Sequence, residues 1–279
     1  MENPKVSIIM PTYNRAYVLW KAIQSIQFQE YPHWKLIIVD DHSTDDTEKL
    51  IREFRSDSRI ICIKNDDKTH SPAGARSKGY DFIEGNYVAY LDSDNTASTD
   101  WLSTVIQLFS EDKKAKFIYT GQNFQTLLLE NGVYKTLIQR SGLEEHPTTE
   151  SLWSHTFDGD PNGLIHTADA LDKINGWDED LSLYEDYDYS LQLAQAYPKG
   201  IRYLPIALIN YTRLYGEKGI CNGATYKSIV KNLIYLKEKY KDNPNWTKQT
   251  WPDKLIKKYT KYDNAGISPI TRIKSKYAK

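Results

Sequence analysis

The first hundred residues alternate short apolar runs with amphipathic segments. The apolar runs predict four strands, at residues 6–10, 36–40, 60–63 and 87–91. The segments between them predict three helices, at residues 17–28, 47–54 and 72–83. Strands that alternate with helices in this way are typical of βα units around a largely parallel sheet. The sequence therefore predicts an α/β fold, Rossmann-like, with helices flanking a mostly parallel sheet.

After residue 94 the alternation becomes less regular. The pattern predicts a helix near 101–109, a strand near 117–125, and a hairpin that turns at Asn131–Gly132. A helix is predicted at 186–197, followed by strands around 201–211. Beyond Tyr226, apolar residues recur at helical spacing, as Ile229, Leu233 and Leu236. We therefore expect a C-terminal amphipathic helix that packs on the body.

The composition indicates a globular protein. With 279 residues, of which 40% are hydrophobic, the chain is long enough to bury a core. No apolar stretch approaches the roughly 20 residues that cross a bilayer, and the N-terminus lacks the charge pattern of a signal peptide. Cys62 and Cys221 form neither a disulfide framework nor a metal-binding spacing. We expect a cytoplasmic location.

The charges are unevenly distributed. Residues 226–279 contain 14 Lys and Arg against 4 Asp and Glu, whereas the whole chain has a formal net charge of -1. The chain thus has an acidic body and a basic tail. Two interpretations of the tail are open: a solvated helical surface, or a peripheral contact with anionic lipid or another polyanion. We do not expect nucleic acid as a partner.

Polar side chains follow three of the predicted strands, at 11–15, 40–45 and 92–95. Ligands of an open α/β sheet bind beyond the carboxyl ends of its strands, so these positions predict the site. No closely spaced glycines follow the first strand, and no Gly-rich segment ends in Gly-Lys-Ser/Thr. The sequence therefore disfavours a dinucleotide-binding enzyme and a P-loop enzyme.

Asp92 and Asp94 stand one residue apart at the end of the fourth strand. Two such carboxylates repel each other unless a cation lies between them or one is protonated. Oxygen ligands suit Mg²⁺ or Mn²⁺, which commonly use few protein carboxylates together with substrate phosphates. A solvated acidic turn is the alternative interpretation.

Five stretches together resemble the family 2 glycosyltransferases, whose GT-A fold opens with a nucleotide-binding βα unit. They are VSIIMPTYNR at 6–15, IIVDDHSTD at 37–45, ARSKG at 75–79, YLDSDN at 90–95, and NGWDE at 175–179 followed by EDYD at 185–188. The resemblance spans roughly residues 4–215. It divides the chain into a nucleotide-sugar-binding half at 1–98, an acceptor-binding and catalytic half at 99–225, and a basic helical extension at 226–279.

The resemblance implies a donor site for a nucleotide-sugar, with Asp41 on the base and UDP favoured. Asp94 would bind Mn²⁺ or Mg²⁺ at the diphosphate, and Asp92 would serve either the ribose or the metal. The donor-binding residues it implies are Pro11, Thr12, Tyr13, Asn14, Arg15, Asp41, Arg76, Asp92, Ser93, Arg213 and Lys218. Arg213 and Lys218 would lie in a loop over the diphosphate, although this sequence lacks the His and Ser residues often found in that loop.

The resemblance also implies an inverting transfer to a hydroxyl of a glycan or glycolipid. Asp186 is the expected general base, and Glu185 would bind the acceptor or orient Asp186. An acidic helix N-terminus is the structural alternative for this pair. Trp153, Trp177 and Tyr184 could stack on an acceptor sugar, although burial is the commoner fate of tryptophan. His166 is a candidate third metal ligand or acceptor contact, with a structural histidine as the alternative.

Two other functions stay open on the sequence. A sugar-phosphate nucleotidyltransferase needs the same metal and diphosphate site but not the Glu185–Asp186 pair. A non-catalytic nucleotide-sugar-binding domain is the second. A phosphatase that uses Asp92 as nucleophile is disfavoured, because that motif normally follows the first strand of its fold.

Overall fold

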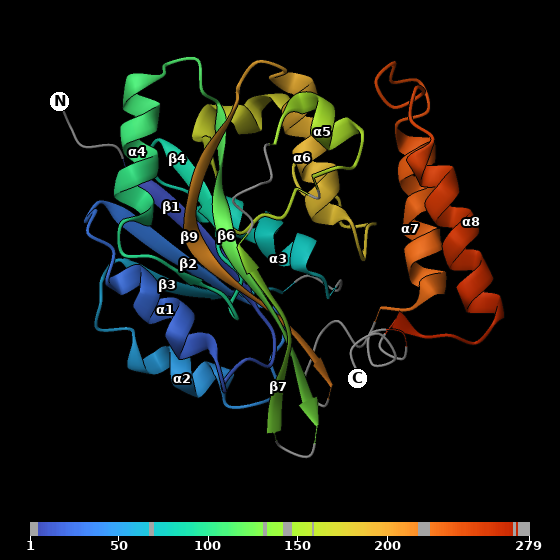
Figure 1. Ribbon diagram of the computed structural model, residues 1–279. Helices are drawn as coiled ribbons and strands as arrows, with labels where there is room; N and C mark the ends of the chain where they lie inside the picture. The colour runs from blue at the N-terminus through green and yellow to red at the C-terminus, as the bar shows by residue number, and fades with distance from the viewer. Residues whose placement is uncertain are drawn as a thin grey trace.

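The first part of the chain forms the predicted βα units (Figure 1). The structure is a computed structural model that describes residues 5–66, 70–130, 133–141, 147–157, 159–216, 224–269 and 272. Its first four strands are β1 (Val6–Thr12), β2 (Trp34–Asp40), β3 (Ile60–Lys64) and β4 (Tyr87–Tyr90). They lie parallel in the order β3-β2-β1-β4. All four predicted strands are confirmed.

The helices between these strands are confirmed as well. They are α1 (Leu19–Gln27), α2 (Thr47–Glu53) and α3 (Pro72–Gly79), which continues as a short 3₁₀ turn, η1 (Tyr80–Phe82). The Ser71 side chain accepts a 3.0 Å hydrogen bond from the backbone N–H of Gly74, and Pro72 occupies the first turn of α3. Both residues suit a helix start, because proline has no N–H to leave unpaired there.

The second half extends the sheet with strands of mixed direction. They are β5 (Thr96–Ala97), β6 (Phe117–Glu130), β7 (Val133–Ser141), β8 (Leu164–Thr167) and β9 (Ile201–Gly216). The strand order continues β4-β8-β6-β9-β5, and β7 pairs with β6. β8 is antiparallel to both β4 and β6, whereas β6 and β9 run parallel. The strands expected around 201–211 are one long strand that continues to Gly216.

The predicted hairpin is also present. β6 and β7 are antiparallel, with Glu130 opposite Val133. The turn residues Asn131 and Gly132 lie outside the described residues. The remaining elements of this half are α4 (Trp101–Glu111), α5 (Thr149–Trp153), the 3₁₀ segment η2 (Ala168–Lys173) and α6 (Glu185–Ala196).

The core lies on both faces of the sheet. Because side chains alternate along a strand, Ile8 and Met10 face one side while Ile9 faces the other. One cluster packs the sheet against α1 and α4, and the other packs it against α3, α5 and α6. Figure 1 shows α1 and α4 on one side of the strands and α3, α5 and α6 on the other. Burial on both faces explains why the strands are continuous apolar runs in the sequence.

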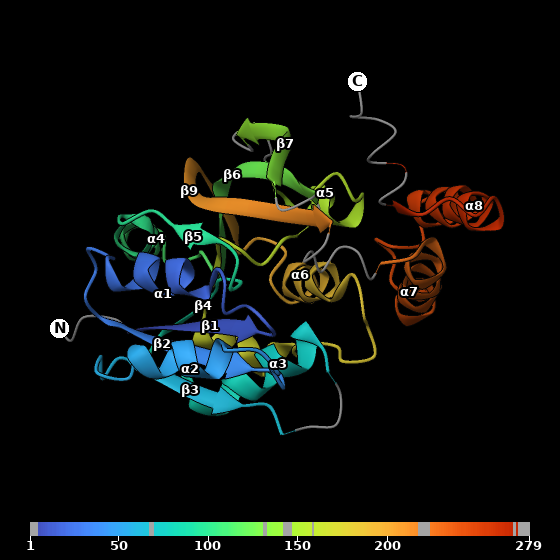
Figure 2. The ribbon, with the colours of Figure 1, turned by 90° about the horizontal axis from the view of Figure 1, so that it is seen from below.

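The C-terminal residues form two helices, α7 (Tyr226–Lys239) and α8 (Trp251–Asn264), that pack on each other at one end of the molecule (Figures 1 and 2). Leu233 and Leu236 of α7 are fully buried, as the helical spacing predicts. The buried Asp188 of α6 lies 2.9 Å from Lys239 and accepts a 2.8 Å hydrogen bond from Tyr240. This contact fixes α7 on the body. None of the helices in the described ranges has the length and apolar character needed to cross a bilayer.

Candidate active site

A cavity of about 480 Å³ opens at the carboxyl ends of β1, β2 and β4. Most of the residues predicted to bind the donor line it: Pro11, Thr12, Tyr13, Arg15, Asp41, Arg76, Asp92, Ser93 and Arg213. Asp94, Glu185 and Asp186 line the same cavity. Lys218, predicted to bind the donor, lies outside the described residues. We refer to this space as the donor cavity.

Asn14 is the exception among the predicted donor residues. It is not among the residues that line the donor cavity. Its side chain oxygen accepts a 2.8 Å hydrogen bond from the backbone N–H of Thr44, and its own N–H donates to Ser43 at 2.9 Å. Asn14 has φ 49, a left-handed conformation that asparagine tolerates better than most residues. It therefore holds the loop after β1 against the loop after β2.

Asp41 lies among rings at one end of the donor cavity. Its carboxylate accepts a 2.8 Å hydrogen bond from the Asn65 side chain amide. The ring of His70 lies 4.1 Å from that of His42 and 6.4 Å from that of Tyr13. Flat rings beside a hydrogen-bonding carboxylate suit a heterocyclic base. The ligating atoms of Asp41, His42 and His70 also lie within 4.8 Å of one another, a mixed oxygen and nitrogen set that a metal ion such as zinc accepts.

Asp92 is held from two sides. One carboxylate oxygen accepts a 2.7 Å hydrogen bond from Arg76, and the other accepts a 2.8 Å bond from the Asn162 side chain amide. The backbone N–H of Asp92 donates back to Asn162 at 2.7 Å. The charge of Asp92 is therefore already balanced by the protein.

The charge of the Asp94 carboxylate is less well balanced by the protein than that of Asp92. The cationic partner of Asp94 is Arg15, whose guanidinium lies 3.4 Å from the carboxylate. Burial raises the pKa of Asp94 to about 6, Arg15 opposes the shift, and the charge of Asp92 adds to it. A buried carboxylate in this state is stabilised by a further cation. The residues present thus fit a divalent ion with oxygen ligands, with Asp94 as the better ligand.

Arg76 connects the two halves of the site. Its guanidinium bonds Asp92, lies 3.4 Å from Glu185, and stacks 4.5 Å above the ring of Trp177. Burial alone would lower the pKa of Arg76, but the carboxylates of Asp92 and Glu185 raise it above its ordinary value. Arg76 is therefore a fixed cation at the wall of the donor cavity.

Glu185 and Asp186 open helix α6. Tyr184 precedes them as the N-cap, with φ 65 in the left-handed region. The backbone N–H of Tyr187 donates to Asp186 at 2.7 Å. Burial raises the pKa of Asp186 well above its ordinary value, and the charges of Glu185 and Asp160 add to the shift. Burial also raises the pKa of Glu185, although Arg76 opposes the shift.

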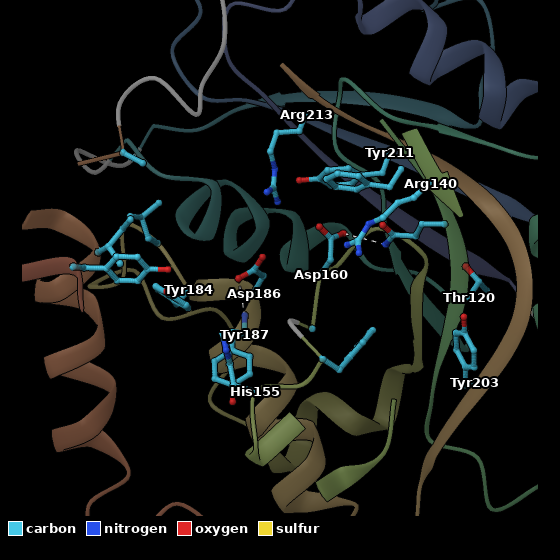
Figure 3. A pocket seen from close by; sticks show the side chains of 18 residues that line it. Thr120, Arg140, His155, Asp160, Tyr184, Asp186, Tyr187, Tyr203, Tyr211 and Arg213 are labelled. Atoms are coloured by element: carbon cyan, nitrogen blue, oxygen red, sulfur yellow. Dashed lines mark hydrogen bonds between the residues drawn. The ribbon is translucent and has the colours of Figure 1, made fainter. Parts of the chain in front are cut away.

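A second cavity, also of about 480 Å³, lies on the other side of Asp186 and is shown in Figure 3. It extends from α6 to β6, β7 and the C-terminal helices, and we call it the outer cavity. Tyr184, predicted to bind the acceptor, lines it beside His155 and Tyr187. The residues that line both cavities are Asp160, Asp186, Tyr211 and Arg213. Asp186 therefore stands at the junction of the two spaces.

The two tryptophans predicted to stack on an acceptor lie elsewhere. Trp177 is 5% exposed, and its ring stacks on Tyr189 at 4.2 Å. Trp153 is 2% exposed and packs against Tyr240. Neither lines the outer cavity. Their large apolar rings are better accommodated in the core, where Trp177 supports Arg76.

The expectation that His166 contacts a metal or acceptor is also wrong. His166 lies in the middle of β8 and is fully buried. Tyr90 and Tyr189 bond its Nε2 at 2.9 and 2.8 Å, and its Nδ1 lies 2.8 Å from the backbone oxygen of Thr167. Burial lowers the pKa of His166 to about 4, so the ring is neutral at pH 7. Its role is structural.

Two residues of the site were missed by the sequence analysis. Asp160 and Asn162 flank Pro161 in the loop before β8 and lie beside Asp92 and Asp186. Burial raises the pKa of Asp160 to about 6, and the charge of Asp92 contributes. The available signal was the cluster of Gly159, Pro161 and Gly163, which indicates a shaped loop.

Comparisons with known proteins agree with this geometry. The model of the family "Glycosyl transferase family 2" matches residues 7–156, more than half of the chain. The glucosyltransferase WfaP of Escherichia coli, named for UDP-Glc and alpha-D-GlcNAc-diphosphoundecaprenol, is 37% identical over 131 residues, which are 47% of this chain and 51% of WfaP. The Campylobacter jejuni GalNAc(5)-diNAcBac-PP-undecaprenol beta-1,3-glucosyltransferase is 38% identical over 109 residues, 39% of this chain and 35% of that protein. The chain thus spans between a third and about half of these relatives.

Solved structures show the same fold. Staphylococcus aureus TarS, residues 1–349, in complex with UDP-GlcNAc, superposes with a TM-score of 0.69 at 18% identity, over 92% of this chain and 71% of that one. The mannosyltransferase PcManGT from Pyrobaculum calidifontis, in complex with GDP-Man and Mn²⁺, gives a TM-score of 0.59 at 16% identity, over 94% and 70%. The predicted GT-A fold is confirmed. Because the family model matches more than half of the length of this chain, the chain belongs to glycosyl transferase family 2.

Proposed function

We propose that the chain transfers a sugar from a UDP-sugar to a hydroxyl of a lipid-linked glycan, with a divalent metal and with inversion at the anomeric carbon. The observation that carries this proposal is the place of Asp186, a partly buried carboxylate of raised pKa on the wall shared by two cavities. A base between donor and acceptor is what a single displacement requires.

The donor cavity supports a nucleotide-sugar. Asp41, with Tyr13 and His70 nearby, would take the base, and Arg76 and Asp92 would face the sugar and ribose. Asp94 is the residue that best fits the metal, with Asp92 as the second candidate. A divalent ion there would neutralise the diphosphate and assist its departure. TarS in complex with UDP-GlcNAc and PcManGT in complex with GDP-Man and Mn²⁺ support this assignment by fold.

The reaction follows from the place of Asp186. Its carboxylate takes the proton from the acceptor hydroxyl as the oxygen forms a bond to the anomeric carbon. The bond from that carbon to the diphosphate breaks on the opposite face, and UDP leaves with the electron pair. This displacement inverts the anomeric configuration, by analogy with inverting glycosidases. Arg213, which lines both cavities, would balance charge on the leaving diphosphate.

The acceptor is proposed from the relatives. WfaP is named for alpha-D-GlcNAc-diphosphoundecaprenol and the Campylobacter jejuni enzyme for a GalNAc-containing diphosphoundecaprenol glycan. We extend this acceptor class, a glycan on a lipid diphosphate, to the present chain.

The test is transfer from UDP-glucose or UDP-GlcNAc to a short-chain α-D-GlcNAc-diphospho-lipid, with Mn²⁺, with Mg²⁺ and with EDTA. We expect a lengthened glycan, UDP as the second product, a metal requirement, and a product anomeric configuration opposite to that of the donor. In a parallel reaction with UTP and a sugar 1-phosphate, formation of a UDP-sugar with release of pyrophosphate would instead indicate a nucleotidyltransferase. If a panel of UDP-sugars yields neither transfer nor binding, the proposal fails.

A further inference from the structure

The outer cavity presents two carboxylates, of which the proposed mechanism uses only one. Figure 3 shows Asp160 and Asp186 projecting into the same space, which Arg213 also lines. Asp160 comes from the loop before β8, whereas Asp186 comes from the start of α6. The two are close enough for the charge of Asp160 to raise the pKa of Asp186. Asp160 is therefore next to the proposed base without belonging to its helix.

The loop that carries Asp160 has a fixed shape. Gly159 has φ 71 and Gly163 has φ 83, both in the left-handed region that favours glycine. A Cβ at Gly159 would lie 2.5 Å from the Ser190 side chain oxygen, and one at Gly163 would lie 2.5 Å from that of Thr120. The sequence between these glycines, Asp160-Pro161-Asn162, is thus held tightly against α6 and β6.

The two oxygens of the Asp160 carboxylate have different surroundings. Oδ1 accepts hydrogen bonds from the backbone N–H of Asn162 at 2.8 Å, from its side chain amide at 3.0 Å, and from Gln122 at 3.3 Å. Among the residues that the structure describes, no hydrogen bond to Oδ2 is found. The carboxylate of Asp160 is partly buried and is held so that Oδ1 is fully occupied while Oδ2 can accept a hydrogen bond from a ligand.

The rest of the outer cavity suits a sugar. Phe124 and Tyr211 stack at 5.0 Å with an angle of 10° between their rings, and Tyr184 and His155 lie across the space. Aromatic walls with a few polar groups that fix orientation are typical of small-molecule sites. A hydroxyl that donates to a carboxylate forms a charge-assisted bond, which is stronger than a bond between neutral groups.

We propose that Asp160 is an acceptor-binding residue, whose Oδ2 accepts a hydrogen bond from a second hydroxyl of the acceptor sugar, close to the hydroxyl that Asp186 deprotonates. The inference rests on the proposed function and identifies what the acceptor must carry. The acceptor is a sugar with two free hydroxyls close enough together to reach both carboxylates.

Asn162 connects this contact to the donor cavity. Its side chain amide donates to Asp160 at 3.0 Å and to Asp92 at 2.8 Å. The acceptor hydroxyl, Asp160, Asn162 and Asp92 would then form one hydrogen-bonded chain between the two substrates. A network of this kind orients both substrates toward the reacting atoms, an effect that contributes to the rate without new chemistry.

The experiment compares Asp160→Asn with the wild type. A panel of short-chain lipid-diphosphate sugars, beginning with α-D-GlcNAc, is tested first, and the sugar that the wild type glycosylates fastest is chosen as the acceptor. Monodeoxy derivatives of this acceptor are then compared with it. We expect Asp160→Asn to raise the acceptor KM about tenfold to a hundredfold, the range for loss of a hydrogen bond to a charged group. The acceptor KM should rise by a larger factor than the UDP-sugar Kd, because Asp160 is connected to the donor cavity only through Asn162 and Asp92. Asp169→Asn, an exposed carboxylate paired with Lys116, is the matched control.

The deoxy acceptors decide the assignment. With the wild type, one deoxy acceptor should show the same rise in KM that the Asp160→Asn variant shows with the full acceptor. The variant should have the same KM for that deoxy acceptor as for the full acceptor. The inference is overturned if Asp160→Asn leaves the acceptor KM unchanged, or if it raises the UDP-sugar Kd by the same factor as the acceptor KM. It is also overturned if each deoxy acceptor raises the KM of the wild type and of the variant by the same factor. If the wild type glycosylates no member of the panel and hydrolyses no donor, the proposed function itself has failed.

Discussion

Glu185 and Asp186 are adjacent in the sequence, yet their carboxylates have different partners. Glu185 faces Arg76 at 3.4 Å, which stabilises its charge. Asp186 accepts a hydrogen bond from the Tyr187 N–H, while Glu185 and Asp160 both repel its charge. The carboxylate that stands between the two cavities is therefore the one that forms no ion pair with Arg76. At the scale of single residues, this difference selects Asp186 rather than Glu185 as the base.

Replacing Asp186 with Asn keeps the shape of the side chain and removes the proton acceptor. We expect kcat to fall by at least about a hundredfold, the lower end of the range for general base catalysis, with little change in UDP-sugar binding. Steady-state rates and calorimetric titration with UDP-sugar measure the two effects. Undiminished transfer by this variant would exclude Asp186 as the base.

The raised pKa of Asp186 also predicts the pH dependence. A general base acts only when deprotonated, so kcat should increase as pH rises through the pKa of the Glu185–Asp186 pair. Burial raises this pKa, so the acidic limb of the profile should lie above the ordinary value of 3.8 for aspartate. An initial-rate profile with saturating donor measures it. A flat profile down to pH 4 would contradict the assignment.

Arg76 should not tolerate lysine. A lysine keeps the charge but cannot reach Asp92 and Glu185 together while stacking on Trp177. We expect Arg76→Lys to lower the free energy of unfolding by about 2 kcal/mol and to weaken donor binding. Denaturant unfolding and UDP-sugar titration measure these changes.

Arg59 offers a matched control for Arg76. It also pairs with a carboxylate, Asp57 at 2.8 Å, and lies 3.8 Å over Trp34, but its side chain is 37% exposed and away from both cavities. Arg59→Lys should leave donor binding unchanged. Equal loss of donor binding in both variants would show that Arg76 has no specific role.

The sequence predicted residues of the site where a strand end identified them. Asp41, Asp92 and Asp94 follow apolar runs, and the ends of parallel strands meet at one edge. Asp160 follows no strand and belongs to no motif, so only the fold brings it to Asp186. Trp177 and His166 lie away from their expected places for the opposite reason. Position along the chain does not reveal which side chains are buried in the core.

At the scale of elements, α6 carries both the proposed base and the anchor for α7. Its first turn presents Asp186 to the cavities and Asp188 to Lys239 and Tyr240. The motif EDYD thus combines a proposed catalytic carboxylate with a structural one. Helical spacing explains the division, because residues two apart point to different sides of a helix.

The anchor can be tested with two aspartates that pair with lysines of α7. Asp188→Ala leaves Lys239 with Asp178 alone and removes the hydrogen-bond acceptor of the buried Tyr240, so it should lower the free energy of unfolding by about 1–3 kcal/mol. Asp253→Ala, which loses the exposed pair with Lys237, should cost at most about 1 kcal/mol. Denaturant unfolding measures both. Similar effects of the two changes would contradict the proposed anchor.

The helices and strands were predictable where the hydrophobic residues followed a single helical or strand periodicity. The first four strands and α1 to α3 follow from alternation and from helix caps. β8 was missed because Leu164–Thr167 is short and carries His166, whose polar ring is satisfied by Tyr90 and Tyr189 only in the folded sheet. The continuous strand β9 was underestimated because its extension beyond Tyr211 is stabilised by pairing with β6 rather than by its own pattern.

At the scale of the whole molecule, the charge asymmetry has a definite location. Four exposed lysines of α8, at positions 254, 257, 258 and 261, follow helical spacing and share one face. α8 lies at the outer edge of the molecule (Figure 2). We propose that this face contacts anionic lipid, which would bring the outer cavity toward a membrane-linked acceptor.

Reversal of these four lysines to glutamate tests the contact. Each lysine near an anionic surface contributes about 1 kcal/mol, so the variant should lose most of its binding to phosphatidylglycerol vesicles in a sedimentation assay. The control reverses four exposed lysines elsewhere: Lys21, Lys49, Lys113 and Lys114. Equal losses in both variants, or no vesicle binding by the wild type, would contradict a specific contact.

The pairing of β6 with β9 has a consequence for how the protein is made. These strands are parallel neighbours, yet residues 131–200 lie between them in the sequence. Loops of that length close slowly, and strands far apart in sequence cannot pair until the later one has left the ribosome. Strands β1 to β4 can assemble early, whereas both cavities need Tyr211 and Arg213 of β9. We therefore expect a nascent chain that ends before β9 to expose apolar surface and to depend on chaperones until β9 has left the ribosome.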